Sequence, residues 1–362
     1  MQRPPIQTTS PLRRREDVDP RLRVLSREPL TAETPLVHHH APLTPNDVFY
    51  VRNHFAVPKI GAADYRLAIS GEVLRPLVLD YRVLRAMPCR SLTVTLECAG
   101  NGRSDVQPPT PGEPWGYGAV GTAEWTGVPL RDVLAMARLA PECREVVFEG
   151  ADSGHVQGHS DRMPFARSLP REVALDPATL LAFEMNGEPL SHNHGFPIRL
   201  IVPGVYGVAS VKWLRRIEAI AGHFDGYFQG ERYVVVRPGQ KELEPLGHMR
   251  VRAVMVTPLE GASLRRGPHE IEGYAWSGAG PIERVEVSSD GGATWDRAAL
   301  RETPSPYAWV GWRYEWRAEE RGEFALCSRA FDTSGATQPE AAEWNRFGYA
   351  NNAIQTVTVS VR

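Results

Sequence analysis

The residue with the clearest capacity for chemistry is Cys98, in the stretch "LTVTLECAGNGRSD" that spans residues 92–105. Leu92, Val94 and Leu96 alternate with polar residues, which predicts a half-buried strand that ends at the cysteine, before a glycine-rich turn. A free thiol in this position is either a small apolar side chain, a nucleophile or a ligand for a soft metal ion. The local sequence leaves these three roles open.

Three further segments insert polar side chains into apolar surroundings, namely "FYVRNHFAVP" (49–58), "SHNHGFPIRL" (191–200) and "VKWL" (211–214). Taken singly, Arg52 and Arg199 fit ordinary strand surfaces, and His194 fits a turn before a glycine. Together they gather cations beside one thiol, which would suit a large anionic cofactor and an oxyanion substrate.

Several other signals do not carry a function. The glycines of "GYGAVG" (116–121) have dinucleotide-binding spacing, but no strand precedes them and no helix follows. The "HHH" at 38–40 lies on a proline-flanked stretch without fixed geometry, so a metal role is not expected there. The cysteines are far apart and form no C-x-x-C motif, which excludes a disulfide framework, a zinc knuckle and covalent haem attachment. They are Cys89, Cys98, Cys143 and Cys327.

Composition narrows the class of protein. A net charge of −2 over 362 residues gives no support to nucleic-acid binding, and no apolar run reaches the length of about 18 residues that a membrane span needs. The arginines of "PLRRREDVDP" (11–20) are followed by acidic residues and prolines rather than an apolar export segment. The chain as given is therefore expected to be cytoplasmic, or periplasmic if a signal has been removed.

The elements that must position these side chains are predicted to divide into three regions. Residues 1–45, rich in Pro, Arg and Thr, are expected to form an extended arm. Residues 46–245 mix strands with helices in the irregular order of an α+β domain. The expected strands are 65–73, 144–152 and 197–204, and the expected helices are 130–140, stopped by Pro141, and 176–187, capped by Asp176.

Residues 246–362 have an all-β character. Six or seven short strands alternate with Gly, Asp, Ser and Pro turns, and "SDGGATW" (289–295) predicts a hairpin connection. This spacing fits an immunoglobulin-like sandwich, although the Cys…Trp…Cys pattern of antibody domains is missing. A terminal sandwich without chemical side chains most often serves packing or assembly.

The ordered motifs resemble one known family. "VRNHFAVP", "ECAGNGR", "WTGVPLRDVL", "EMNGEPLSHNHGFPIRLIVPGVYG", "VKWL" and "IEGYAWSGAG…VEVSSDGGATW" are similar, in this order, to the sulfite oxidase family of molybdopterin enzymes, over residues 46–362. The resemblance implies a molybdopterin-binding domain followed by an immunoglobulin-like dimerisation domain, and hence a homodimer. It also implies oxygen-atom transfer from a molybdenum cofactor to sulfite, with electrons passed to a separate acceptor, a cytochrome or oxygen. No haem is expected in this chain.

The same resemblance assigns roles to individual residues. Cys98 matches the thiolate that ligates molybdenum, and the nearby cations are expected to favour its thiolate form. Arg52, Arg103 and Tyr233 match residues at the substrate. The cofactor-binding positions are Tyr50, Val51, Arg52, Asn53, His54, Asp152, His194, Arg199, Ser210, Val211 and Lys212.

The sequence departs from the family pattern at two positions. Gly102 stands where the animal enzymes carry a second consecutive arginine, and Phe347, next to Arg346, stands where they send an arginine from the second domain into the substrate pocket. Substrate identity therefore stays open among sulfite oxidation, a sulfane dehydrogenase subunit, a nitrate reductase and a sulfoxide reductase. A cofactor-free binding protein is the alternative outside enzymes, and it predicts that Cys98 only packs.

Overall fold

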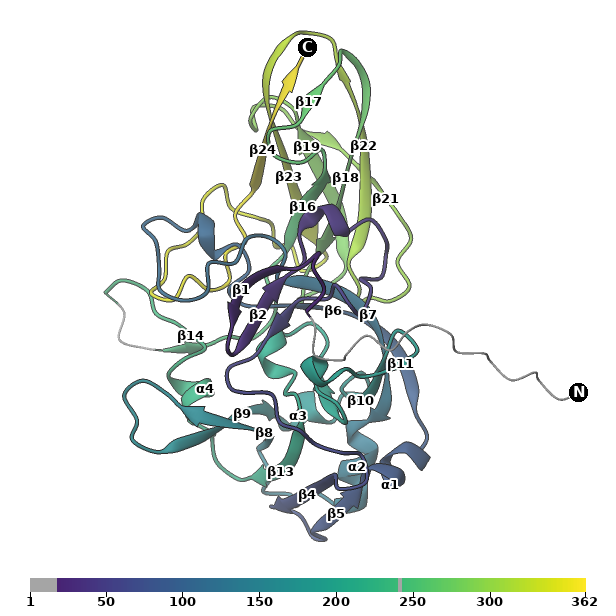
Figure 1. Cartoon of the computed structure of the whole chain (residues 1–362), viewed down its shortest axis with the longest axis vertical. Helices are drawn as coiled ribbons and strands as arrows, with labels where there is room; N and C mark the ends of the chain where they lie inside the picture. Colours follow the sequence, from purple (N-terminus) through teal and green to yellow (C-terminus); the bar gives the residue numbers. More distant parts are fainter. Residues whose placement is uncertain (1–17, 240–242) are drawn as a thin grey trace, which may run out of the picture.

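The structure is a computed structural model, and it describes residues 18–239 and 243–362. Within these ranges the chain is mostly β-structure with a few short helices. Figure 1 shows a broad first domain, coloured purple to teal, and a narrower second domain that extends away from it and ends at the C-terminus. Less helix is present than the expected mixture of strands and helices suggests.

The first sheet of the first domain carries the strand that precedes Cys98. Its strand order is β11-β10-β7-β6, and β12 pairs with β10 in addition to β7 and β11. Every pairing in it is antiparallel. Its strands are β6 (Arg90–Glu97), β7 (Val120–Pro129), β10 (Leu180–Met185), β11 (Glu188–Pro189) and β12 (Arg199–Ile201).

The second sheet of the first domain has the order β5-β4-β13-β8-β9. Only β4 and β13 run parallel, and the other pairs are antiparallel. Its strands are β4 (Arg66–Gly71), β5 (Leu77–Asp80), β8 (Glu145–His155), β9 (Arg162–Pro170) and β13 (Leu214–Ile220). The expected strands at 65–73, 144–152 and 197–204 are confirmed as β4, β8 and β12.

Short helices connect these strands. They are α1 (Tyr81–Ala86), α2 (Leu130–Ala137), α3 (Arg171–Ala174) and α4 (Tyr227–Gly230), with 3-10 turns η1 (Leu36–His38), η2 (Arg103–Asp105), η3 (His192–His194) and η4 (Gly207–Ala209). The helix expected over 130–140 is confirmed as α2, but it ends earlier than Pro141. Arg138 adopts a left-handed conformation with φ of 58°, which terminates the helix.

The helix expected over 176–187 is wrong, because this segment is the central strand β10. Asp176 does cap local N–H groups, since its carboxylate accepts from the backbone of Ala178 at 2.6 Å, but the chain then extends. Leu180 and Leu181 are fully buried between β7 and β12. An apolar run that is buried on both faces has no two-residue period, so its sequence is indistinguishable from that of a buried helix.

The expected extended arm is also different where the structure describes it, from residue 18 onward. β1 (Arg23–Arg27) and β2 (Leu30–Glu33) form an antiparallel hairpin, and β2 pairs with β3 (Val51–Arg52). This three-stranded sheet fixes the backbone that leads into Asn53 and His54. The first 17 residues lie outside the described part.

The second domain places two sheets on one core. Their orders are β16-β18-β22-β21 and β17-β24-β23-β19-β20. The strands are β16 (Arg252–Thr257), β17 (Ser263–Leu264), β18 (Gly267–Trp276), β19 (Ile282–Ser288), β20 (Asp296–Arg297), β21 (Ala299–Leu300), β22 (Val310–Ala318), β23 (Gly322–Asp332) and β24 (Gln355–Val361). Buried side chains from both sheets, among them Trp312 and Val285, fill the space between them.

Two smaller features complete the architecture. β14 (Val234–Val235) pairs with β15 (Glu244–Pro245) beside the junction of the two domains. The expected hairpin connection "SDGGATW" joins β19 to β20, and the carboxylate of Asp290 holds it by accepting from Thr294 at 2.6 Å. In the described residues, no helix has the length and apolar character required to cross a membrane.

Candidate functional site

One cavity gathers most of the side chains that the sequence singled out. It encloses about 690 Å³ of empty space, its open mouth included. It forms where β6 and β3 end and where the turns η3 and η4 approach them. Its lining residues are Phe49, Tyr50, Arg52, Asn53, His54, Leu96, Cys98, Ala99, Asp152, Phe165, Asn193, His194, Arg199, Gly207, Val208, Ser210, Lys212, Trp213 and Tyr233.

Three of the predicted site residues do not line this cavity, namely Val51, Arg103 and Val211. Val51 pairs with Ala32 in the β2–β3 ladder, and the side chain of Val211 packs into the main hydrophobic core. The backbone of Val211 accepts a hydrogen bond from the Leu200 N–H at 2.8 Å, which ties the lysine-bearing segment to β12. These two valines thus hold the backbone from which their neighbours reach the cavity.

Cys98 lies at the cavity wall, directly after β6. Its Sγ-bearing side chain is buried, and its carbonyl accepts from the Asn101 N–H at 2.9 Å to begin the turn. Burial raises the pKa of the Cys98 thiol, and the Gly100 N–H, Arg103 and Arg52 oppose this shift without reversing it. Arg103 and Arg52 thus act to favour the thiolate, but burial outweighs them. Coordination to a metal ion is the interaction that deprotonates such a thiol outright.

Arg103 is buried and its guanidinium is already paired. Nε donates to the carbonyl of Phe347 at 2.8 Å, and Nη1 donates to the carbonyl of Glu113 at 2.7 Å. Its guanidinium also lies 5.0 Å from the centre of the Tyr349 ring. In this structure Arg103 connects the loop after Cys98 with the second domain through Phe347. Its side chain does not line the cavity.

Gly102 owes its identity to a second-domain arginine. Its φ is +77°, a region that side-chain-bearing residues rarely adopt, and a Cβ at this position would overlap Nη2 of Arg252. The guanidinium of Arg252 therefore occupies the space that a side chain at 102 would need. The turn therefore does have a second cation beside it, but this cation comes from Arg252 at the start of β16 and not from position 102.

Arg252 belongs to a buried polar network at the domain junction. Its Nη1 donates to Oε1 of Glu97 at 3.2 Å and to the carbonyl of Asn101 at 3.1 Å. Glu97 also accepts from Asn101 Nδ2 at 3.0 Å and from Trp276 Nε1 at 2.9 Å. Because Glu97 directly precedes Cys98, this network sets the position of the thiol from both domains.

His54 and Tyr233 form the most direct polar contact in the cavity. His54 Nε2 and the Tyr233 hydroxyl are 2.6 Å apart. Burial lowers the pKa of His54 well below its ordinary value, and burial raises the pKa of Tyr233. Both groups are consequently neutral near pH 7, so this contact is a hydrogen bond between two uncharged groups.

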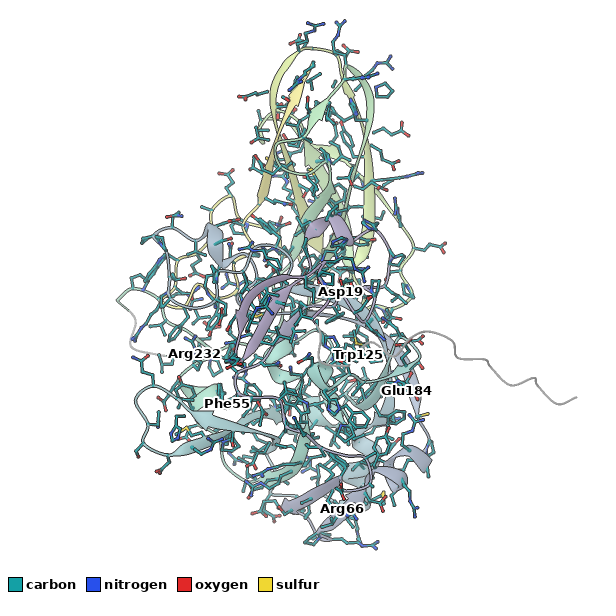
Figure 2. All side chains as sticks on the ribbon, in the orientation of Figure 1. Asp19, Phe55, Arg66, Trp125, Glu184 and Arg232 are labelled. Atoms are coloured by element: carbon teal, nitrogen blue, oxygen red, sulfur yellow. The ribbon has the colours of Figure 1, made fainter. Side chains whose placement is uncertain are left out.

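A second group of cavity residues could bind an anion. We call this group the cradle, and it consists of Asp152, Arg199, Ser210 and Lys212. Arg199 donates to the carbonyls of His194 at 3.1 Å and Ser210 at 3.3 Å, and its guanidinium lies 4.8 Å from the centre of the Trp125 ring, which Figure 2 labels near the middle of the molecule. Lys212 donates to Asn53 Oδ1 and to the carbonyl of Asn193. Burial lowers the pKa of Lys212, and Arg199 lowers it further. An anion placed here would relieve that repulsion between two buried cations.

Two buried atoms in this cradle have no hydrogen-bond partner, Oδ1 of Asp152 and Nε of Arg199. One is an acceptor and the other a donor, and both line the cavity or adjoin it. A ligand that carries N–H groups as well as phosphate oxygens would satisfy both atoms, as a phosphorylated pterin does. The residues present therefore fit such a cofactor.

The described residues give the cavity no cluster of side chains that could hold a metal ion without a cofactor. Among residues 18–239 and 243–362, no group of three or more His, Cys, Asp or Glu side chains could hold a metal ion. Cys98 is the single thiol that lines the cavity. A metal ion bound to Cys98 would need its remaining ligands from a cofactor. This agrees with the neighbouring cradle, whose residues fit a phosphorylated pterin.

Sequence reasoning missed several lining residues, notably Phe49, Phe165, Asn193 and Trp213. Asn193 and Trp213 lie inside the motifs around His194 and Lys212, so these motifs could have identified them as lining residues. Phe165 stacks on His54 with ring centres 4.8 Å apart, but it belongs to β9, and nothing in its local sequence distinguishes it from a core residue.

Comparisons with known proteins agree with this geometry. The model of the oxidoreductase molybdopterin binding domain matches residues 54–228, and that of the Mo-co oxidoreductase dimerisation domain matches residues 244–362. Sulfite oxidase of Gallus gallus is 37% identical over 357 residues, which are 92% of this chain and 77% of that protein. The mitochondrial sulfite oxidase of Rattus norvegicus is 36% identical, over 99% of this chain and 69% of that protein.

A solved structure is similar over nearly the whole chain. The sulfane dehydrogenase SoxCD from Paracoccus pantotrophus superposes with a TM-score of 0.81 and 32% identity, covering 92% of this chain and 85% of that chain. A nitrate reductase of Oryza sativa is 35% identical, but only 41% of its length is covered. The single cavity thiol, the unpaired polar atoms of the cradle and these matches lead to one conclusion: the chain belongs to the sulfite oxidase family of molybdopterin-binding oxidoreductases.

Proposed function

We propose that this protein oxidises sulfite to sulfate at a molybdopterin cofactor bound in the cavity around Cys98. The observation that carries the proposal is the convergence, on one cavity, of a single thiol, the His54–Tyr233 pair and a cradle of buried cations. Similarity to sulfite oxidases over most of the chain supports the same activity. When bound, the molybdenum cofactor supplies oxygen-atom transfer and a two-electron store.

In this proposal the cradle binds the cofactor. Arg199, Ser210 and Lys212 hold its phosphate, because buried cations and hydroxyl groups are strong donors to phosphate oxygens. Asp152 and His194 bind its polar ring, together with Tyr50 and Asn53. Cys98 provides the protein ligand to the metal.

The remaining cavity residues act on the substrate. Arg52 lines the cavity and lies close enough to lower the pKa of Tyr233, so its charge is available to an oxyanion bound there. The Tyr233 hydroxyl and His54 Nε2 are 2.6 Å apart, so a proton can be relayed through their hydrogen bond. Burial lowers the pKa of His54, so its ring stays neutral and one of its nitrogens can accept a hydrogen bond. A water molecule consumed in the reaction would lose its protons along this route.

Sulfane dehydrogenation is the second candidate, and one observation favours it. The sulfane dehydrogenase SoxCD superposes on 92% of this chain with a TM-score of 0.81. A nitrate reductase or a sulfoxide reductase has less support. Parallel assays with sulfite, a protein-bound sulfane, nitrate and a sulfoxide will separate these reactions.

Metal and pterin analysis combined with a sulfite-dependent assay tests the proposal. We expect molybdenum and pterin at about one per chain in protein from a host that makes the cofactor, and reduction of an added cytochrome that depends on sulfite. Protein without molybdenum and pterin from such a host contradicts the enzyme proposal. Molybdenum without sulfite turnover contradicts sulfite as substrate and favours a sister reaction.

The variant Cys98→Ser sharpens this test, with Cys89→Ser as its matched control. Cys89 is exposed, whereas Cys98 lies in the cavity wall, and both are free thiols. We expect Cys98→Ser to fold and to lose turnover by at least about 1,000-fold, since a hydroxyl is a poor ligand for a soft metal. Cys89→Ser retains turnover. A fully active Cys98→Ser enzyme would show that the thiol only packs.

The finer architecture completes the proposal. Residues 46–245 form the molybdopterin-binding domain, and residues 246–362 form an immunoglobulin-like sandwich, in keeping with two sheets on one core. The match to a dimerisation domain supports a homodimer of this 40.2 kDa chain. Sedimentation analysis at micromolar concentration should give twice that mass. Electrons pass to a separate acceptor, a cytochrome or oxygen, and comparing these acceptors in steady-state assays identifies which.

A further inference from the structure

Arg232 occupies a position that the proposed mechanism does not use. It directly precedes Tyr233, in the connection between α4 and β14, and its side chain is half-buried. Among the described residues its guanidinium has no carboxylate or carbonyl acceptor, and its side-chain contacts are with aromatic rings. Figure 2 shows Arg232 on the same side of the view as Phe55, which follows His54 in the chain.

Aromatic stacking connects Arg232 with the cavity. Its guanidinium lies 4.9 Å from the centre of the Phe347 ring and 6.0 Å from that of Tyr349. Tyr349 in turn stacks on Tyr233, with ring centres 5.1 Å apart and planes at 19°. The positive charge of Arg232 acts to lower the pKa values of both Tyr233 and His54, so both cavity side chains lie within its field.

The other cations near the cavity already donate hydrogen bonds to protein acceptors, although the charge of Arg52 remains within the cavity. Arg103 donates to two backbone carbonyls, and Arg52 donates to the carbonyl of Asn53 and to Thr31 Oγ1. Arg199 and Lys212 belong to the cradle. Phe347 supplies no charge at the position where the second domain could send an arginine. Arg232 packs on that same Phe347 ring, and within residues 18–239 and 243–362 no acceptor pairs with its N–H groups.

We propose that Arg232 is a specificity-determining residue, which binds the oxyanion substrate beside Tyr233 and takes the place of a cation at position 347. This inference rests on the proposed function, because it names the residue that selects the substrate of that reaction. The Phe347 ring supports one face of the guanidinium, which leaves its edge of N–H groups free to bind two oxygens of one anion. Sulfite and sulfate both present oxygens in the geometry that such an edge recognises.

The first test is steady-state kinetics of Arg232→Gln and Arg232→Lys in the holoenzyme. Removing the charge should raise the KM for sulfite about tenfold and leave kcat within about twofold, because the residue binds the anion without taking part in bond changes. Lysine keeps the charge but cannot bind two oxygens side by side, so the KM of Arg232→Lys should lie between those of the parent protein and Arg232→Gln. Raising ionic strength should weaken sulfite binding less in Arg232→Gln than in the parent protein.

Arg346→Gln is the matched control. Arg346 lies 5.5 Å from the same Phe347 ring, but it is exposed and separated from Tyr233 along the chain. We expect its KM for sulfite to stay within about twofold of the parent value. An equal rise in KM for Arg346→Gln and Arg232→Gln would show that the loss of any nearby positive charge weakens sulfite binding, and would overturn the proposal. An unchanged KM in Arg232→Gln would overturn it as well.

Sulfate binding separates this inference from the proposed reaction. Calorimetric titration of the parent holoenzyme with sulfate needs no turnover, and the same titration of Arg232→Gln should show about tenfold weaker binding. If the enzyme fails to oxidise sulfite but shows this difference, the proposed reaction is wrong while the oxyanion site stands. Equal sulfate affinities in the two proteins, or no sulfate binding by the parent, contradict the site itself.

Discussion

The pairing of Tyr233 with His54 is the residue-scale feature on which the proposed chemistry depends most. The two polar atoms are 2.6 Å apart in a buried setting, where a hydrogen bond is strong and an unmade one is costly. The Tyr233 ring also stacks on Tyr349, so its packing and its hydroxyl make separate contributions. A substitution that removes only the hydroxyl can therefore distinguish proton handling from packing.

Tyr233→Phe keeps the ring and deletes the hydroxyl. We expect kcat for sulfite oxidation to fall about 10- to 100-fold, because the route from the cavity to His54 Nε2 is lost. Molybdenum content and the unfolding midpoint should stay close to those of the parent protein, since the stacking on Tyr349 remains. Equal kcat values in the two proteins would show that Tyr233 has only a packing role.

At the scale of elements, the turn after β6 connects the Cys98 thiol with the second domain. Gly102 has φ of +77° and lies against the guanidinium of Arg252, while Arg103 donates to the carbonyl of Phe347. Asn351 Nδ2 also donates to the Gly102 carbonyl at 2.7 Å. These contacts mean that the turn cannot take its shape from local sequence alone.

Gly102→Ala tests this tight approach, with Gly261→Ala as the control. Gly261 has nearly the same φ of +75°, but a Cβ there would have nothing within 4 Å. Both variants pay about 1 kcal/mol for the left-handed backbone, and Gly102→Ala should lose about 1–3 kcal/mol more because Arg252 must move. Chemical denaturation measures both free energies of unfolding. Equal losses in free energy of unfolding for the two variants would show that the Arg252 guanidinium moves aside at no cost.

At the scale of the whole molecule, a buried ion pair joins the two domains. Arg252 and Glu97 are each about 2% exposed, and their contact spans 155 positions of the chain. Burial raises the pKa of Glu97, whereas Arg252 and the hydrogen bonds from Asn101 and Trp276 lower it. Figure 1 shows β16, which begins with Arg252, at the junction of the two domains. This buried pair connects the strand that precedes Cys98 with the second domain.

Arg252→Met removes one partner of this pair and leaves a buried carboxylate. We expect a loss of about 3–5 kcal/mol in the free energy of unfolding, together with lower molybdenum content, because Glu97 adjoins Cys98. Arg250→Met is the control, since Arg250 is 30% exposed and pairs with the exposed Glu343. Its loss should stay below about 1 kcal/mol. Similar losses in both variants would contradict a special role for the buried pair.

Much of the protein could be predicted from short sequence patterns. Cys98 at a strand end, the strands β4, β8 and β12, the helix α2 and the two-sheet second domain all follow from local periodicity and turn residues. The ordered motifs also led to eleven of the cavity-lining side chains. Each of these features depends on residues that are neighbours in the chain, which is the range over which a pattern can be read.

Only the tertiary structure decided the features that depend on distant partners. β10 is a strand because β7 and β12 pair with its two edges, and Arg103 does not line the cavity because its guanidinium donates to the carbonyl of Phe347. Gly102 is required by Arg252, a residue 150 positions away in the chain. Burial and hydrogen-bond partners are set by which segments meet in space, so residue types along the chain determined the candidate chemistry and the fold determined which side chains perform it.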